Sequence, residues 1–363
     1  MKKILSAFLA LLIFASALSA CRKQDAASPS PIPSASLAPL ATEEPTAAIE
    51  PTAATEPTAA PYEFEIDYHK CPKIFEDALG GEMLSLARLA VDAFLAGQSS
   101  VVLPNLENAG GISMLLLTAS IMCPPFGAYV DATEVKGYDA QTETLSWNFY
   151  DGDGTLKEIV GRFEECIRQY MSVLVADDTE LMRAIFLYHA YTENMEYDYD
   201  AYYMTEIDGT DPVMRVRLSG YNALVNKLGM CSGISEGLCF LFNQADIDCC
   251  TVNCFEGESG AHEWLIAKFD DKYYFCDPTW EAEGGFKYFG LSFEDRASWA
   301  GGYLEQNILA FNTPIAEKYR VDDTERFSAL RWVEEAPDEI VREGTSIIIR
   351  LNSYSEPIVI DCK

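Results

Sequence analysis

The sequence predicts an α+β fold, and three features lead to this prediction. A stripe of apolar residues at helical spacing runs through residues 82–98, and a second one follows Cys231. Two strand-like runs, at 261–269 and 272–280, are separated by only two residues, which is typical of an antiparallel hairpin. Helices combined with sequence-adjacent antiparallel strands indicate the α+β class.

The amino terminus has the layout of a secretory signal. Two lysines precede an apolar run over residues 4–20, which ends too early for a permanent membrane helix of about 20 apolar residues. The tetrapeptide Leu-Ser-Ala-Cys at 18–21 resembles the bacterial lipobox, in which the cysteine receives lipid and becomes the first mature residue. We expect residues 1–20 to be a signal peptide and Cys21 to be lipidated. The alternative is an ordinary cleaved signal.

Residues 21–62 form a linker rich in proline, alanine, threonine and serine. Within it, Glu-Pro-Thr-Ala-Ala recurs at 44–48, 50–54 and 56–60. This composition cannot bury a core, and repeated proline keeps a chain extended. No unit has an apolar face that could stack on the next, so a stalk is favoured over a solenoid.

The net charge of the chain limits the partners that it is expected to bind. The chain has 26 basic and 57 acidic residues, a net charge of −31, and no basic stripe. Such a protein is repelled by nucleic acid and by anionic lipid headgroups, so we expect no nucleic-acid partner and membrane attachment only through a lipid anchor. Ten cysteines follow Cys21 without a regular framework, which leaves both disulfides and thiols open.

The folded part divides into three predicted segments. Residues 63–172 form an α/β accessory segment, with a helix at 82–98 and then strands, a turn and a helix over 127–174. Residues 173–323 form the main domain, and residues 324–363 form a β extension with strand-like runs at 345–353 and 356–362.

The main domain is expected to open with a helix. Asp177 and Glu180 have the spacing of a capping box, which places the helix start at Asp177. His189 lies in this helix with Glu193 as its polar neighbour, and we interpret it as a structural histidine.

Cys231 is the strongest candidate for a reactive residue. Gly229 and Gly233 flank it and allow a tight backbone turn, and the apolar stripe of a helix follows. The cysteine therefore lies at or near a helix N-terminus, where unpaired N–H groups and the helix dipole favour a thiolate. The same N–H groups can hold an oxyanion during acyl transfer.

A thiolate nucleophile needs a base and a group that orients the base, and the hairpin supplies both. If Asp270-Asp271 is the turn, Phe269 faces Lys272 and the register places Asp277 opposite Trp264. His262 and Asp277 are then diagonal neighbours on one face. A loop of odd length would break this pairing.

Three sequence blocks carry a family resemblance. The stretches GMCSG (229–233), HEW (262–264) and YYFCDPTW (273–280) resemble those of the transglutaminase-like superfamily, a papain-like thiol fold. The resemblance covers roughly residues 175–300. It implies a nucleophile helix packed on an antiparallel sheet, with Cys231 as nucleophile, His262 as base and acid, and Asp277 as its orienter. Ser235-Glu236 departs mildly from the family pattern.

The resemblance implies thiol-dependent acyl transfer on a peptide or protein substrate, without a cofactor. The acceptor is water in a peptidase or amidase and an amine in a crosslinker. No calcium loop and no β-sandwich of the animal crosslinkers is evident, which favours hydrolysis. The rival hypothesis is a non-catalytic module that binds a peptide or cell-wall fragment on a membrane-tethered stalk.

The sequence also raises two other interpretations of residues near the site. A metal site would use Cys249, Cys250, Cys254 and His262, but adjacent cysteines are poor tetrahedral ligands and no C-x-x-C pair is present, so no metal is expected. These cysteines are expected to pack as small apolar side chains. Trp264 and Trp280 either line the cleft or fill the core, and for Trp280 we favour the core.

Anchoring at the extracytoplasmic face of a bacterial cell membrane gives the first testable prediction. If Cys21 carries the lipid, Cys21→Ala releases the protein from membranes or leaves the precursor uncleaved. Membrane fractionation with immunoblotting measures this. Unchanged retention and processing in the variant would contradict it.

Overall fold

The computed structural model describes residues 59–131, 137–204, 211–254, 262–281, 284–299, 308–309, 313–314, 319–320 and 323–363. The signal segment, Cys21 and nearly all of the linker lie outside the described residues. Within the described ranges, no helix combines the length and apolar character needed to cross a bilayer.

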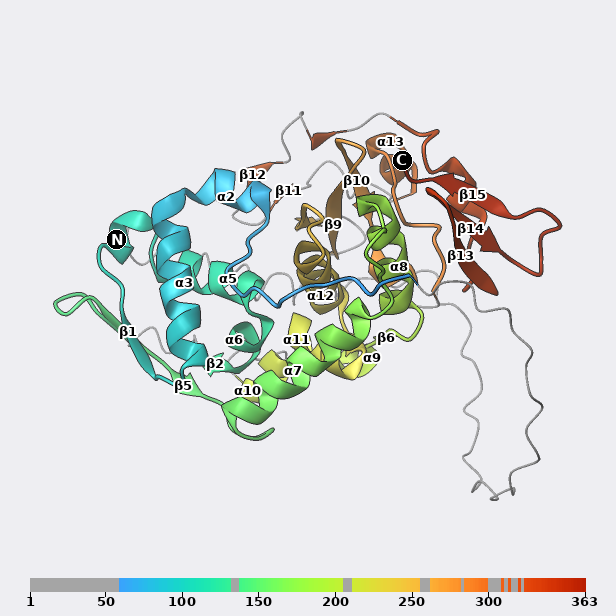
Figure 1. The fold of residues 1–363 in the computed structure, drawn as a ribbon. Helices are drawn as coiled ribbons and strands as arrows, with labels where there is room; N and C mark the ends of the chain where they lie inside the picture. Colours follow the sequence, from blue (N-terminus) through green and yellow to red (C-terminus); the bar gives the residue numbers. More distant parts are fainter. Residues whose placement is uncertain are drawn as a thin grey trace, which may run out of the picture.

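The centre of the molecule is one helix packed on one antiparallel sheet (Figure 1). The helix is α12 (Cys231–Gln244), and the sheet has the strand order β10 (Lys272–Cys276), β9 (His262–Phe269), β8 (Cys249–Cys254), β11 (Ile308–Leu309) and β12 (Thr313–Pro314). The mixed helix and antiparallel-sheet content confirms the α+β prediction.

Strand β9 is buried on both faces, and each face meets a different set of apolar side chains. Leu265, Ala267 and Phe269 belong to the main core with α12, whereas Trp264 and Ile266 lie in a second cluster on the opposite face. Alternate residues of a strand point to opposite sides. The helix therefore packs on one face, and the second cluster closes the other.

The N-terminal segment is mainly helical and lies on the left of Figure 1. Its helices are α2 (Lys73–Leu79), α3 (Gly81–Leu95), α4 (Leu106–Ala109), α5 (Ile112–Met122), α6 (Pro124–Tyr129) and α7 (Leu156–Met171), and its strands are β1 (Ser100–Val102), β2 (Val130–Asp131), β3 (Tyr138–Asp139), β4 (Thr144–Ser146) and β5 (Asn148–Phe149). The helix expected at 82–98 is α3. A capping box at Thr155 and Glu158 fixes the start of α7.

The segment before α12 corrects one expectation. Helix α8 (Glu180–Thr192) is capped by Thr179, whose hydroxyl accepts from the N–H of Met182, so Asp177 is not the cap. Asp178 instead accepts a bond from the N–H of Val175 within the preceding turn. The elements that follow are β6 (Glu196–Tyr197), α9 (Tyr199–Tyr203), α10 (Pro212–Leu218), α11 (Gly220–Asn226) and β7 (Leu228–Gly229), with β6 and β7 paired in parallel.

The carboxyl-terminal extension is a three-stranded antiparallel sheet on the right of Figure 1. Its strands are β13 (Glu339–Glu343), β14 (Ser346–Arg350) and β15 (Ile358–Asp361), preceded by the short helices α13 (Phe293–Trp299) and η7 (Ser328–Trp332). The sequence predicted β14 and β15. It missed β13, which is largely exposed and lacks an apolar run.

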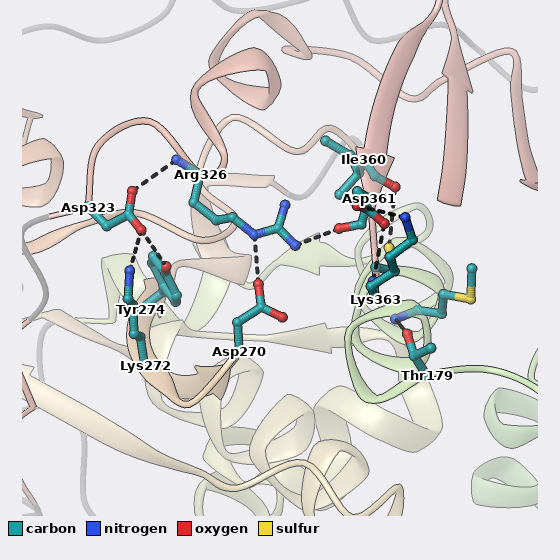
Figure 2. Close-up of polar contacts among 11 residues, drawn as sticks. Thr179, Asp270, Lys272, Tyr274, Asp323, Arg326, Ile360, Asp361 and Lys363 are labelled. Carbon is teal, nitrogen blue, oxygen red and sulfur yellow. Dashed lines mark hydrogen bonds and ion pairs between the residues drawn. The ribbon is translucent and has the colours of Figure 1, made fainter. Parts of the chain in front are cut away.

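Arg326 joins this extension to the central hairpin, as Figure 2 shows. Its Nε lies 2.6 Å from a carboxylate oxygen of Asp270, and its Nη2 donates to the backbone oxygen of Asp361 at 2.5 Å. Asp323 lies beside it and accepts from Lys272 Nζ at 2.7 Å and from the Tyr274 hydroxyl at 3.2 Å. The β9–β10 turn is thus held from outside by the C-terminal segment.

All three segments contribute to one continuous core. The same buried cluster contains Phe163 of α7, Tyr221 of α11, Phe240 of α12 and Ile347 of β14. Phe163 contacts both Tyr221 and Phe240 through its ring, at centroid distances of 5.8 and 5.2 Å. The accessory segment therefore packs directly against α12, the helix that carries Cys231.

An ion pair between the exposed strand β13 and a buried carboxylate just before α8 gives a prediction on stability. Arg342 binds both carboxylate oxygens of Asp178, at 2.6 and 2.8 Å, and the Asp178 side chain is only 1% exposed. Arg342→Met leaves a buried carboxylate without its cation, so the free energy of unfolding should fall by about 2–3 kcal/mol.

The matched control is Arg350→Met on the same sheet. Arg350 pairs with Glu339 at 2.8 Å, but both side chains are about half exposed, so the loss should stay below about 0.5 kcal/mol. Urea denaturation of both variants measures the difference. Equal losses would contradict the burial argument.

Candidate active site

Cys231 is the first residue of α12, where the sequence placed it. The residue before the helix is Met230, which makes no capping hydrogen bond with its side chain. The first-turn N–H groups of a helix have no acceptor inside that helix, so they are directed at the region around the thiol.

The glycines around Cys231 serve close packing rather than an unusual backbone turn. Neither Gly229 nor Gly233 has a positive φ. A Cβ at Gly233 would lie 2.9 Å from the backbone oxygens of Leu218 and Ser219, closer than atoms tolerate. The expected tight turn is therefore not the reason for these glycines: Gly233 lets the α10–α11 connection approach the start of α12, and Gly229 packs against Ala223 and Ile234.

The hairpin register confirms the prediction made from the two-residue turn. Asp270 and Asp271 both have positive φ, 51° and 64°, as a two-residue hairpin turn requires. Lys272 pairs with Phe269 and Cys276 with Leu265, so the next position places Asp277 beside Trp264. His262 Nε2 lies 2.8 Å from Asp277 Oδ2, as the diagonal relation requires.

Cys231, His262 and Asp277 form a continuous hydrogen-bonded chain. The Cys231 and His262 side chains are hydrogen-bonded, and because Asp277 occupies Nε2, the nitrogen that faces the thiol is Nδ1. Cys231 is 8% exposed, His262 7% and Asp277 0%. The Cys231 and His262 residues are thus largely buried, and Asp277 is fully buried.

The charges of His262 and Asp277 stabilise each other. Burial by itself lowers the pKa of His262, but the Asp277 carboxylate and the Cys231 side chain outweigh it and raise the pKa to about 9. Burial likewise raises the pKa of Asp277, but His262 and Arg296 outweigh it, and the pKa lies below its usual value. The site thus favours an imidazolium beside a carboxylate at neutral pH.

The pH dependence follows from the direction of the His262 shift. The folded pKa of about 9 lies above the ordinary value of 6.5. Protonation of His262 therefore stabilises the folded chain fully below about pH 6.5, and this contribution is lost as the pH rises through about 9.

Two side chains that the sequence did not assign to the site complete its surroundings. Trp280, which we expected in the core, is 36% exposed, and its ring stacks on the His262 imidazole at 5.1 Å and 10°. Arg296 is fully buried, and its Nη2 lies 3.1 Å from Asp277 Oδ2. Trp280 directly follows the Asp-Pro-Thr stretch, a usable signal, whereas Arg296 lies 19 residues beyond Asp277 and no spacing rule indicates it.

Two glutamates lie on the other side of the thiol. Burial raises the pKa of Glu236 to about 7, and burial together with the charges of Glu236 and Cys231 raises the pKa of Glu263. The Ser235 hydroxyl donates to the Glu263 carbonyl oxygen at 3.0 Å, and Glu236 accepts from the Gly220 N–H at 3.2 Å. The unusual Ser235-Glu236 pair thus ties the nucleophile helix to β9 and to α11.

The remaining cysteines of the central sheet are packed side chains. Cys249 belongs to the core on the helix side, whereas Cys250 and Cys254 lie in the cluster on the opposite face. Cys239 and Cys249 are thiols with their sulfurs 3.7 Å apart. Among the residues that the structure describes, no group of three or more ligating side chains has the arrangement of a metal site.

His189, which the sequence indicated to be a structural histidine, lies in α8. Its Nδ1 is 3.2 Å from the Gly284 carbonyl oxygen, and its ring stacks on Phe286 at 5.8 Å. These contacts are those of a structural histidine.

Comparisons with known proteins add one weak likeness. No family model matches the chain, and no curated protein matches it. A solved structure described as a TGase is similar over 34% of this chain and 31% of its own, with 16% sequence identity and a TM-score of 0.28. The chain thus spans about a third of that protein's length.

Proposed function

We propose that the protein is a thiol-dependent acyl transferase of the transglutaminase-like type that hydrolyses a peptide or amide bond. The observation that carries the proposal is the hydrogen-bonded order of Cys231, His262 and Asp277, with the thiol at a helix start. This arrangement provides a nucleophile, a base within reach of it, and a group that orients the base.

In the first step, the Cys231 thiolate attacks the carbonyl carbon of the amide, and the carbonyl electron pair moves to oxygen. The first-turn N–H groups of α12 can receive this negative charge. The tetrahedral species collapses, the carbon–nitrogen bond breaks, and the leaving amine takes the proton from His262 Nδ1. The products are a thioester at Cys231 and a neutral His262.

In the second step, neutral His262 takes a proton from water while the oxygen attacks the thioester. Collapse breaks the carbon–sulfur bond and releases the carboxylic acid. The thiolate and the imidazolium are restored, so protons and electrons balance over the cycle. Asp277 keeps the imidazole ring oriented and stabilises its charge throughout.

Water is the proposed acceptor because Cys231 and His262 are largely buried. With Cys231 8% and His262 7% exposed, a water molecule reaches the thioester more easily than an amine carried on a second protein chain. A small free amine remains the competing acceptor, and product analysis in the presence of glycine methyl ester distinguishes the two.

The same burial favours a second candidate, a module that binds a peptide or cell-wall fragment without turning it over. In either case, we propose that a lipid anchor at Cys21 and the proline-rich linker hold the folded part at the outer membrane surface, where its substrate or ligand is a peptide or protein.

Selective alkylation tests the nucleophile. Reduced native protein treated with limiting iodoacetamide near neutral pH should be modified first at Cys231, because His262 favours its thiolate. His262→Ala should slow the reaction by about tenfold or more, Asp277→Asn should slow it less, and His189→Ala should leave it within about twofold. Peptide mapping gives the rate for each cysteine.

Turnover separates the enzyme from the binding module. A panel of peptide and amide substrates is incubated with wild type and with Cys231→Ala, and released amine is measured. Cleavage that is lost in Cys231→Ala supports hydrolysis. If Cys231 is alkylated no faster than Cys239 or Cys254, or if His262→Ala changes nothing, the catalytic proposal is wrong.

A further inference from the structure

Arg296 makes a contact that the reaction as proposed does not require. Its guanidinium is fully buried, and its Nη2 lies 3.1 Å from the same oxygen of Asp277, Oδ2, that binds His262 at 2.8 Å. Burying an unpaired arginine lowers the stability of the fold, so the contact with Asp277 is what allows Arg296 to be buried here.

The aromatic surroundings link Arg296 to the histidine a second time. The guanidinium carbon lies 4.3 Å from the centre of the Trp264 ring and 4.6 Å from that of Trp280. The His262 imidazole stacks on the same two indoles, at 5.5 and 5.1 Å. A shift of the guanidinium would therefore disturb both the carboxylate and the ring that the carboxylate orients.

The start of α13 fixes where Arg296 lies. The Ser292 hydroxyl accepts from the Asp295 N–H at 3.0 Å and donates to the Asp295 carboxylate at 2.9 Å, and the Arg296 N–H donates to the Ser292 carbonyl oxygen at 3.0 Å. Ser292 is fully buried. The backbone at Arg296 is thus held, and its side chain reaches Asp277 from a helix outside the central sheet.

We propose that Arg296 is a positioning residue of the Cys231–His262–Asp277 chain, which holds the Asp277 carboxylate in place and draws part of its charge away from His262. The inference rests on the proposed function, because it assigns a role within that reaction. Arg296 acts on His262 through Asp277.

The sign of its effect follows from the net charge of the cluster. When His262 loses its proton, the pair with Asp277 changes from neutral to −1, and the nearby positive charge of Arg296 stabilises that state. Without this charge the proton leaves less readily, so His262 becomes a weaker acid toward the leaving amine. The titratable or charged groups that face Asp277 from the packed elements are His262, Arg296, Glu281, Cys276, Tyr188 and Tyr288.

The test measures the pKa of His262 by NMR in Arg296→Gln, which keeps a polar side chain and removes the charge. The pKa should rise by about one unit, and kcat on any substrate found in the panel should fall by about tenfold at an unchanged KM. Arg296→Lys restores the charge, so its His262 pKa should return to within about 0.3 units of wild type.

Arg331→Gln is the matched control. Arg331 is a largely buried arginine that donates to the backbone oxygens of Phe289 and Gly290, at 2.6 and 3.0 Å. Its charge acts on Cys276, Glu281 and Tyr188, so its loss tests a buried charge near the site that is not paired with Asp277. The His262 pKa should not move in this variant. An equal rise in Arg331→Gln, or no rise in Arg296→Gln, would overturn the proposal.

These variants separate a failure of the Arg296 proposal from a failure of the proposed hydrolysis. If Arg296→Gln does not fold, Arg296→Met, which keeps an unbranched side chain without the charge, decides: a rise of about one unit in the His262 pKa supports the role of the charge, and an unchanged value refutes it. If wild type shows no turnover that depends on Cys231, the proposed hydrolysis fails. The NMR result then still reports whether Arg296 acts on His262 through Asp277.

Discussion

The hydrogen bond between His262 and Asp277 is the interaction on which the rest of the site depends. Both groups are buried, and a buried charge is tolerated only when it is paired and hydrogen-bonded. The surrounding structure supplies this pairing from three elements, with His262 on β9, Asp277 after β10, and Arg296 on α13. Helix α12 then places its first residue, Cys231, beside the imidazole.

This geometry depends in turn on a two-residue turn. One extra residue between Phe269 and Lys272 would move every later side chain to the other face of the sheet and separate the histidine from the carboxylate. Asp270 and Asp271 adopt positive φ values, which are unfavourable for most side chains. Arg326 binds Asp270 at 2.6 Å, so the C-terminal segment stabilises the turn that sets the register.

Local sequence patterns predicted much of the fold and the three central residues. The apolar stripe after Cys231, the pair of strand-like runs and the short turn each determine structure over a few residues, and together they bring His262 and Asp277 to one face. Features that depend on tertiary contacts were missed. Arg296 reaches Asp277 only because α13 packs beside the sheet, and Trp280 lies at the surface because it covers the imidazole.

Two further predictions failed, one on the cap of α8 and one on strand β13. Asp177 has the spacing of a cap, yet Thr179 caps α8, and the neighbouring Asp178 pairs with Arg342 far along the chain. Strand β13 carries no apolar run and is defined by its pairing with β14. Asp178 finds its partner 164 residues along the chain, which a local pattern does not contain, whereas β13 pairs with the next strand in a hairpin.

The measurement that tests the central claim most directly is an NMR titration of the three histidines, assigned with single His→Gln variants. His262 should titrate at about 9, and its pKa should fall in Asp277→Asn, because burial is then no longer opposed by the carboxylate. A wild-type His262 that titrates near 6.5 and does not respond to Asp277→Asn would contradict the account.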